Sequence, residues 1–308
     1  MANKYTNIQA REVDFVTRFG SNWDALRDIL GIARPVKKSN GTELKYYKSS
    51  MPNGLKTSPQ AGKQIEFSDV EIEEVRFGTV TVEKYAKKTP IEEVTQYGAD
   101  VAIERSDDAF LNELQTNVLT RFYAFLNTGS LTGSENDFQM ALSMAKGKVL
   151  DKFKKMRKTV TEVVGFVNVL DVYRYIGAAN VTIQTAFGIQ YIKDFMGYKT
   201  LFLLSAPDIA EGTVIATPVE NIIYYYVDPE DSDFAKMGLQ YQVDGETPLI
   251  GFHVEGNYGT ASGESYALMG ITLMAEYLDG ISVLTFGSTS NSGTEGGENS
   301  DDENSEGV

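Results

Sequence analysis

Between Ser106 and Asn127, apolar residues recur at intervals of three, four and seven positions. This spacing places them on one stripe of a helix with 3.6 residues per turn. Ser106 has the side chain of a helix N-cap, and Asn127 to Gly129 tolerate the left-handed conformation found at helix C-termini. The pattern predicts one helix over 106–127, about 33 Å long. Its apolar members are Phe110, Leu111, Leu114, Val118, Leu119, Phe122, Phe125 and Leu126.

A second helix is predicted from Glu135 to Lys158, with Ser134 as its N-cap. Its second half carries seven basic residues against one acid, Asp151. Such a run is typical of a solvated helix face. The alternative is an electrostatic contact with an acidic neighbour.

The first 34 residues form an amphipathic segment that the sequence Gly20-Ser21-Asn22 interrupts. We expect two short helices here, the second ending at Gly31. Such an N-terminal arm packs either on its own domain or on a neighbouring subunit, and the sequence leaves both open.

Residues 35–63 are rich in Gly, Pro, Ser and Asn, and they carry six lysines against one acid, Glu43. A projecting hairpin suits this composition better than a long structureless loop. One limb is expected at 44–47, the tip at Pro52-Asn53-Gly54 and the start of the return at 64–67. Alternation over 70–85 then predicts a strand, with irregularities near Glu73-Glu74 and Gly78.

The rest of the chain alternates between helix and strand patterns, which indicates an α+β fold with a mixed sheet. Thr89 is expected to cap a short helix that Gly98 ends. Further helices are expected after Asp171 and over 182–196. Strands are expected over 163–170, 200–204, 213–217, 222–227, 266–273 and 282–286.

Composition narrows the possible chemistry. The chain has 308 residues, no cysteine, one histidine and a net charge of −15. Disulfides, thiolate metal sites and cysteine nucleophiles are therefore excluded. The acidic balance argues against a tight nucleic-acid binder, although it suits a protein that encloses nucleic acid without adhering to it. The acidic, low-complexity segment 287–308 is expected to be disordered.

Targeting and catalytic motifs give little positive evidence. The N-terminus lacks the apolar core of a secretory signal, and no apolar run reaches the length of a membrane span, which favours a protein made and kept in a cytoplasm. The acids of 228–233 suggest a solvated turn more than a calcium loop. Glu92 and Glu93 suit the start of a helix, and His253 suits a structural role in a strand. We expect no catalytic residue, cofactor or metal site.

The order of these elements, and three short stretches, resemble the major capsid protein of tailed bacteriophages. The stretches are Arg121 to Gly129 (RFYAFLNTG), Thr200 to Ala216 (TLFLLSAPDIAEGTVIA) and Glu276 to Phe286 (EYLDGISVLTF). The resemblance implies an N-terminal arm (1–34), an extended loop (35–88) and a peripheral domain with a long spine helix (89–160). It further implies an axial domain (161–238), a return to the peripheral domain (239–286) and a disordered acidic tail (287–308).

The resemblance also implies a function. The expected role is a structural, non-enzymatic subunit that self-assembles through pentamers and hexamers into an icosahedral virion shell around double-stranded DNA. Assembly would take place in a bacterial host cytoplasm, with separate scaffold and portal proteins and without a membrane. The family's lysine–asparagine cross-link is not carried over, because no partner residues match. The candidate contacts between subunits are Lys45, Tyr46, Tyr47, Lys48, Lys56 and Pro207.

Three alternatives remain open from the sequence. The first is an encapsulin-type shell that encloses cargo enzymes. The second is an acidic cytoplasmic hydrolase, which would depend on Glu92 or Glu93. The third is a tail or decoration protein of a virion.

Overall fold

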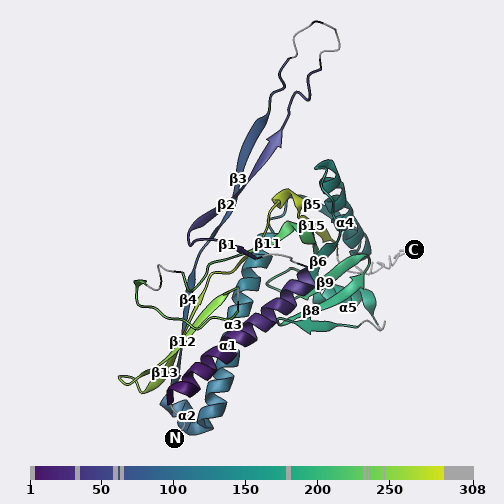
Figure 1. The fold of residues 1–308 in the computed structure, drawn as a ribbon. Coiled ribbons are helices and arrows are strands. Elements are labelled where there is room, and N and C mark those ends of the chain that lie inside the picture. The colour runs from purple at the N-terminus through teal and green to yellow at the C-terminus, as the bar shows by residue number, and fades with distance from the viewer. Residues whose placement is uncertain are drawn as a thin grey trace, which may run out of the picture.

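The computed structural model describes residues 4–31, 35–57, 62, 66–177, 182–231, 234, 236–245 and 247–287. Figure 1 shows a body of helices and sheets from which one two-stranded hairpin projects far outward. Two long helices cross in the middle of the body, and a large sheet lies beside them. The prediction of disorder for the tail falls on residues 288–308, outside the described residues.

The first helix, α1, runs without a break from Lys4 to Leu30, so the prediction of two short helices is wrong. Gly20 does not end the helix. A glycine fits at this position because Asp244 packs closely against it: an added Cβ would lie 2.9 Å from the Asp244 carboxylate. Phe15, Phe19 and Trp23 are almost fully buried against other parts of the same chain. The structure therefore places the arm on its own domain.

The longest described helix, α3, extends from Ala99 to Leu126. Six of the eight residues of the predicted apolar stripe are buried, while Phe110 and Phe125 are half-buried against the same core. It begins seven residues before the predicted N-cap, directly after Gly98. Ser106 does not cap it, because its hydroxyl instead contacts Lys87 and Thr89 of strand β4 (Glu83–Pro90). Ser106 is therefore used in tertiary contacts, and the preceding helix-forming residues extend α3.

Between β4 and α3 lies the short helix α2 (Ile91–Tyr97). Its N-cap is Pro90, while Thr89 belongs to β4 and pairs with Gly263. The single strand expected over 70–85 is two strands, β3 (Glu71–Val80) and β4. The predicted irregularity near Gly78 is confirmed: Leu44 pairs with Gly78 but Lys45 pairs with Arg76, which leaves one extra residue in β3.

The large sheet has seven strands in the order β5-β15-β10-β6-β9-β8-β7. Only the β15–β5 and β6–β9 pairs are parallel, so the sheet is mixed, as predicted. The strands are β5 (Leu131–Glu135), β6 (Val163–Asn168), β7 (Gln184–Ala186), β8 (Ile189–Phe195), β9 (Tyr198–Leu204), β10 (Thr213–Pro218) and β15 (Ser282–Phe286).

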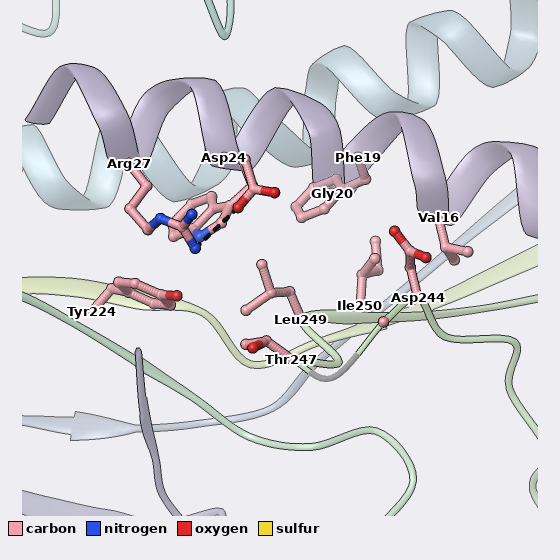
Figure 2. A pocket seen from close by; sticks show the side chains of 12 residues that line it. Val16, Phe19, Gly20, Asp24, Arg27, Tyr224, Asp244, Thr247, Leu249 and Ile250 are labelled. Carbon is pink, nitrogen blue, oxygen red and sulfur yellow. Dashed lines mark ion pairs between the residues drawn. The ribbon is translucent and has the colours of Figure 1, made fainter. Parts of the chain in front are cut away.

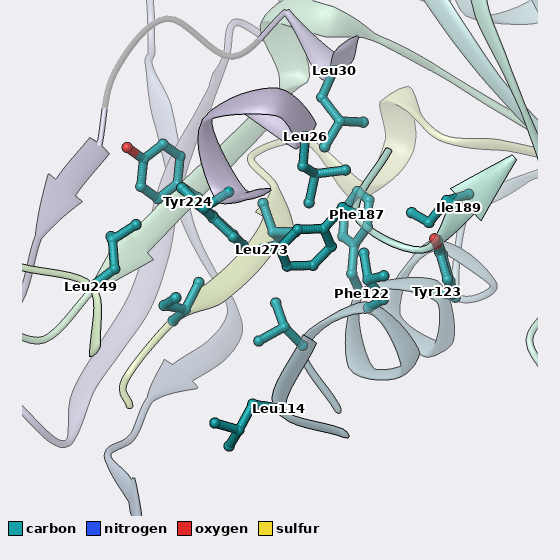
Figure 3. Packing of buried hydrophobic residues seen from close by; sticks show 14 of the residues in the cluster. Leu26, Leu30, Leu114, Phe122, Tyr123, Phe187, Ile189, Tyr224, Leu249 and Leu273 are labelled. Atoms are coloured by element: carbon teal, nitrogen blue, oxygen red, sulfur yellow. The ribbon is translucent and has the colours of Figure 1, made fainter. Parts of the chain in front are cut away.

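Both faces of this sheet are covered, which explains why every residue of β6 is buried. Val167 faces a core formed with α4 (Phe138–Lys155) and α5 (Val169–Ile176). Phe166 faces the opposite core, where α1 and α3 pack. Figure 3 shows Leu26 of α1, Phe122 of α3 and Ile189 of β8 in that second core.

Two predicted caps are corrected in this region. Residues 131–135 form strand β5, and the cap of α4 is Asp137, whose side chain accepts a hydrogen bond from the Met140 amide at 2.8 Å. The cap of α5 is Asn168, whose side chain accepts a hydrogen bond from the Leu170 amide. The predicted cap, Asp171, lies inside the helix and accepts a hydrogen bond from the Gly212 amide at 2.7 Å.

The helix expected over 182–196 is wrong: this stretch forms the antiparallel strands β7 and β8. Phe187 and Gly188 both have positive φ angles, as do Met196 and Gly197 at the next turn. Two consecutive positive φ angles define the tight turn that best fits the twist of a hairpin. The chain therefore reverses at each pair and builds one edge of the sheet.

Two three-stranded sheets join early and late parts of the chain. One has the order β1-β11-β14 and contains β1 (Pro35–Lys37), β11 (Ile222–Tyr226) and β14 (Thr272–Ala275). The other has the order β12-β13-β4 and contains β12 (Ile250–Asn257) and β13 (Ser262–Met269). The strand predicted over 266–273 is therefore divided at Gly270. Short 3₁₀ turns, η1 (Val219–Asn221) and η2 (Leu278–Gly280), precede β11 and β15.

Candidate functional site

The most distinctive surface is the projecting hairpin, which consists of β2 (Thr42–Ser50), β3 and the connection between them. Its base is anchored: Leu44 and Val80 are buried together with Tyr225 and Val227. Beyond this base the two strands leave the body (Figure 1). The hairpin is therefore positioned by the core while most of its length lies outside it.

The predicted tip of the hairpin lies at the wrong place. The amide of Lys56 donates a hydrogen bond to the Ser68 hydroxyl at 2.9 Å, so the two limbs still run side by side at that point. A local turn does occur at the predicted tip, where the Gly54 amide bonds to the Met51 carbonyl. Most of the connection between Lys56 and Phe67, including the first two residues of the expected return at 64–67, lies outside the described residues.

Four charged side chains of the hairpin pair with one another: Glu43, Lys45, Glu74 and Arg76. Glu74 accepts from Lys45 at 3.2 Å and from Arg76 at 3.0 Å, and these hydrogen bonds, Arg76 first, lower the pKa of Glu74. Arg76 also lies 3.2 Å from Glu43. Such exposed pairs stabilise a fold little, but they fix side-chain positions.

The return strand changes the charge balance that the first limb suggested. Residues 35–63 are basic, yet residues 42–80 together hold five basic and six acidic side chains. The whole hairpin is therefore nearly neutral. This balance argues against a hairpin that binds an acidic partner through charge alone.

Apolar side chains without cover are the stronger feature. Leu55 is 75 % exposed, Phe67 86 % and Ile72 70 %. Tyr47, Met51 and Val70 are exposed as well. Apolar surface gathered on one projecting element marks an interaction site more often than scattered surface residues do.

The structure places five of the six predicted contact residues on this hairpin. Tyr47 is 60 % exposed with the Lys45 ammonium over its ring, and Lys56 is exposed. For Tyr46 and Lys48 only the backbone is described, paired with Val75 and Glu73.

Pro207, the sixth predicted contact residue, is not part of the hairpin. It lies in the turn between β9 and β10, which the Asn127 side chain ties to the end of α3 by donating to the Asp208 carbonyl. Sequence reasoning missed Leu55, Phe67, Val70 and Ile72. The available signal was apolar residues within or beside a stretch rich in Gly, Pro and Ser.

A cleft of about 940 Å³ lies between the body and the part of the hairpin where the β2–β3 pairing ends. Tyr47 and Ile72 line its hairpin side, while Met156, Lys158 and Tyr277 line its body side. The cleft has room for a polypeptide segment, but the residues that line it do not form a nucleophile and base pair.

A smaller groove of about 190 Å³ lies between α1 and the 244–250 segment. Figure 2 shows Gly20 of α1 opposite Asp244, with the Asp24–Arg27 ion pair (3.1 Å) farther along. The groove is a packing seam between α1 and this segment, and it contains no arrangement suited to catalysis.

The other candidates for chemistry occupy ordinary structural positions. Glu92 and Glu93 are exposed in the first turn of α2. His253 lies in β12 with its Nδ1 3.3 Å from a Glu12 oxygen, and Asp228 pairs with Lys37 at 2.6 Å. Among the described residues, no group of three potential ligands could hold a metal ion. In the same part of the chain, no helix combines the length and apolarity needed to cross a bilayer.

Comparisons with known proteins identify the fold. No family model matches the sequence, and no curated protein matches it significantly. A structure from Gordonia phage Cozz aligns with a TM-score of 0.53 at 8 % identity, covering 84 % of this chain and 86 % of that one. One from Microbacterium phage Oxtober96 aligns with a TM-score of 0.50 at 12 % identity, covering 84 % and 90 %. The asymmetric unit of the bacteriophage PhiM1 mature capsid aligns with a TM-score of 0.48 at 9 % identity, covering 82 % of this chain and 85 % of that one.

The chain has the major capsid fold of tailed bacteriophages. In this capsid fold, α3 is the long spine helix and the projecting hairpin is the extended loop. The expected fold class is thereby confirmed. The expected boundaries of the peripheral and axial domains stay a prediction.

Proposed function

We propose that this chain is the repeating subunit of an icosahedral shell, the head of a tailed phage that encloses double-stranded DNA. The observation that carries the proposal is the projecting hairpin, since it presents apolar side chains that its own chain leaves exposed. An isolated two-stranded hairpin is marginally stable in water. A second copy that covers it would remove this apolar surface from water and stabilise both the hairpin and the assembly.

The rest of the proposal follows from the fold and the charge. A net acidic subunit can surround DNA without binding it tightly. The partners of the chain would be further copies of itself in pentamers and hexamers, together with separate scaffold and portal proteins. The protein would act in the virion after assembly in the host cytoplasm, and it would act as a structural component without enzymatic turnover.

The test is negative-stain electron microscopy of the purified full-length protein, paired with light scattering. Closed shells, or rings of five and six subunits, are the expected result. Protein that remains monomeric even when candidate scaffold proteins from the same genome are co-expressed would contradict the proposal. Tubes, or binding only to preformed shells, would instead indicate a tail or decoration protein.

The contents of the particles distinguish a phage head from an encapsulin-type compartment. Particles from the native source should contain double-stranded DNA, measurable by absorbance at 260 nm and nuclease digestion after opening. Particles that hold a cargo enzyme and no DNA would leave the shell function intact but overturn the phage-head assignment.

A further inference from the structure

The second half of α4 and the residues that follow it form a strongly basic surface. We call residues 146–158 the basic end of α4. It contains seven basic side chains and one acid, Asp151. The basic side chains are Lys146, Lys148, Lys152, Lys154, Lys155, Arg157 and Lys158.

Only part of this charge is neutralised by neighbours. Lys152 pairs with Asp279 at 3.0 Å and Lys155 with Asp151 at 2.5 Å. Lys154 and Arg157 are exposed and form no ion pair with any residue in the described ranges. These two cations therefore face solvent and can bind an anionic partner.

Other lysines of the basic end serve as anchors. Lys148 donates to the Thr132 carbonyl at 2.9 Å, and the Lys158 ammonium lies 3.6 Å from the centre of the Tyr277 ring. Neither contact supplies a negative charge. The surface as a whole stays positive in a protein whose net charge is −15.

The chain carries a matching anion at its other end. Residues 288–308, which we call the acidic tail, contain six carboxylate side chains and no Lys or Arg. The stretch from Ser288 to Thr294 is uncharged, and the first acid is Glu295. The remaining acids are Glu298, Asp301, Asp302, Glu303 and Glu306.

The acidic tail starts within reach of the basic end. It follows β15, whose last residue, Phe286, packs on Phe138 at the beginning of α4, with 5.6 Å between ring centres. The basic end lies at the other end of α4, which at 18 residues is about 27 Å long. The nine-residue step from Phe286 to Glu295 spans up to about 30 Å when extended. The uncharged stretch is thus long enough to carry the first carboxylate along α4.

We propose that the acidic tail binds the basic end of α4 in the same chain and shields it from other polyanions. Covalent attachment gives the tail an effective concentration of about millimolar, so it competes well with nucleic acid. Removing positive surface from competition would keep the subunit from adhering to DNA. The intramolecular contact itself does not depend on the proposed shell function.

The first experiment detects the contact directly. The full-length protein is treated with a carbodiimide, which joins carboxylates to amines in contact, and the products are mapped by mass spectrometry. We expect links from tail carboxylates to Lys154, Lys155 and Lys158. Tail links that favour the exposed lysines of β4, Lys84 and Lys88, would overturn the proposal.

An equal mixture of isotopically labelled and unlabelled protein shows whether the contact is made within one chain. Links within one isotope class are expected for a contact in the same chain. Tail links that join labelled to unlabelled chains in statistical proportion would overturn that assignment.

The second experiment measures shielding. Fluorescence anisotropy with a short DNA duplex at about 50 mM salt compares the full chain with a tail-neutral variant, in which the six acids are replaced by Asn or Gln. We expect the variant to bind DNA about tenfold more tightly or better, because phosphate contacts are electrostatic. Unchanged affinity would overturn the shielding.

A matched pair of substitutions separates local shielding from the change in total charge. In the tail-neutral variant, Lys154→Gln with Arg157→Gln should abolish most of the gain in DNA affinity. Lys84→Gln with Lys88→Gln should leave the gain in place. Equal losses from both pairs would mean that only total charge matters, and the proposal would fail.

Discussion

At the scale of single residues, the most consequential contact is a buried carboxylate that joins three parts of the chain. Asp107 of α3 is 3 % exposed and accepts two hydrogen bonds of 2.6 Å from Arg11 of α1. Lys87 of β4 forms an ion pair with it as well. Asp107 therefore fixes the N-terminal arm to the spine helix and to the neighbouring sheet.

Asp107→Asn should destabilise the unassembled subunit by about 3–5 kcal/mol, because it leaves two cations facing each other without their counter-charge. Chemical denaturation measures the change. The matched control is Asp108→Asn, since Asp108 pairs with Arg18 at 2.6 Å but is half exposed. The control should cost less than about 1 kcal/mol. Similar losses from both substitutions would contradict the role assigned to Asp107.

The same contact predicts a pH dependence. Burial by itself raises the pKa of Asp107, but the hydrogen bonds from Arg11 and Lys87 outweigh burial and leave the pKa below its usual value. A lowered folded-state pKa contributes stability above the unfolded value of about 3.9, and this contribution is lost as the pH falls through the folded-state pKa. The stability difference between wild type and Asp107→Asn should therefore be constant near neutral pH and shrink below about pH 4. Denaturation series at several pH values check this.

At two exposed glycines, substitution by alanine should change the stability of the subunit in opposite directions. An added Cβ would meet nothing within 4 Å at either Gly98 or Gly147. Gly98 has a φ of +88° and a ψ of 147°, a region open almost only to glycine, so Gly98→Ala should cost about 1–3 kcal/mol. Gly147 lies inside α4, where Gly147→Ala should stabilise by about 0.5–1 kcal/mol. Thermal unfolding of the two variants should shift in opposite directions, and equal shifts would refute the argument.

At the scale of elements, the sequence predicts best where one periodicity dominates. The stripe of α3 and the buried run of β6 predict their elements correctly because their apolar spacing fits only one kind of element. The spacing of Ile189, Ile192 and Phe195 fits a helix as well as a strand, so periodicity alone predicts the wrong element over 182–196. The deciding feature was Phe187 at a φ of +53°, which no composition rule anticipates for an aromatic residue.

The limits of the helices depended on contacts that only the folded chain reveals. Ser106 has the side chain of a helix cap, yet its hydroxyl contacts Lys87 and Thr89 of β4 instead. Gly20 suggests a break between two helices, yet it lies within α1, where its lack of a side chain leaves room for Asp244. The same holds for the projecting hairpin. The sequence predicts its place in the chain, but its nearly neutral net charge becomes clear only once β3 is known to pair with β2.

The apolar outer part of the hairpin gives the prediction for this element. Leu55→Ser combined with Phe67→Ser should leave the folding of the subunit unchanged, because both side chains are largely exposed. The same variant should reduce the yield of shells or rings, since the apolar contact with a second copy is lost. Met237→Ser, which removes a side chain that is 72 % exposed elsewhere, is the control and should assemble normally. Light scattering and microscopy give the readout, and normal assembly of the double variant would exclude these two residues from the contact.

At the scale of the whole molecule, charge and shape impose opposite demands. Each copy carries a net charge of −15, so neighbouring copies repel one another. Closed assembly then requires contacts whose apolar and hydrogen-bonded area outweighs this repulsion. In the proposed shell, a hairpin that reaches beyond its own body would provide such contacts, and each copy would both contribute a hairpin to a neighbour and receive one.

A shortened hairpin should therefore act on its neighbours as well as on itself. In this variant Asn-Gly joins Ser50 directly to Glu71, the last residues that pair across the hairpin. Its thermal stability should match that of the wild type, since those of the removed residues that the structure describes lie outside the buried clusters. Because head-to-tail contacts close a ring only when every copy contributes, 20 % of shortened copies would leave roughly a quarter of six-membered rings complete. Assembly yield in mixtures, measured by light scattering, should fall far more than the shortened fraction. A fall merely proportional to that fraction would show that the hairpin does not link neighbouring copies.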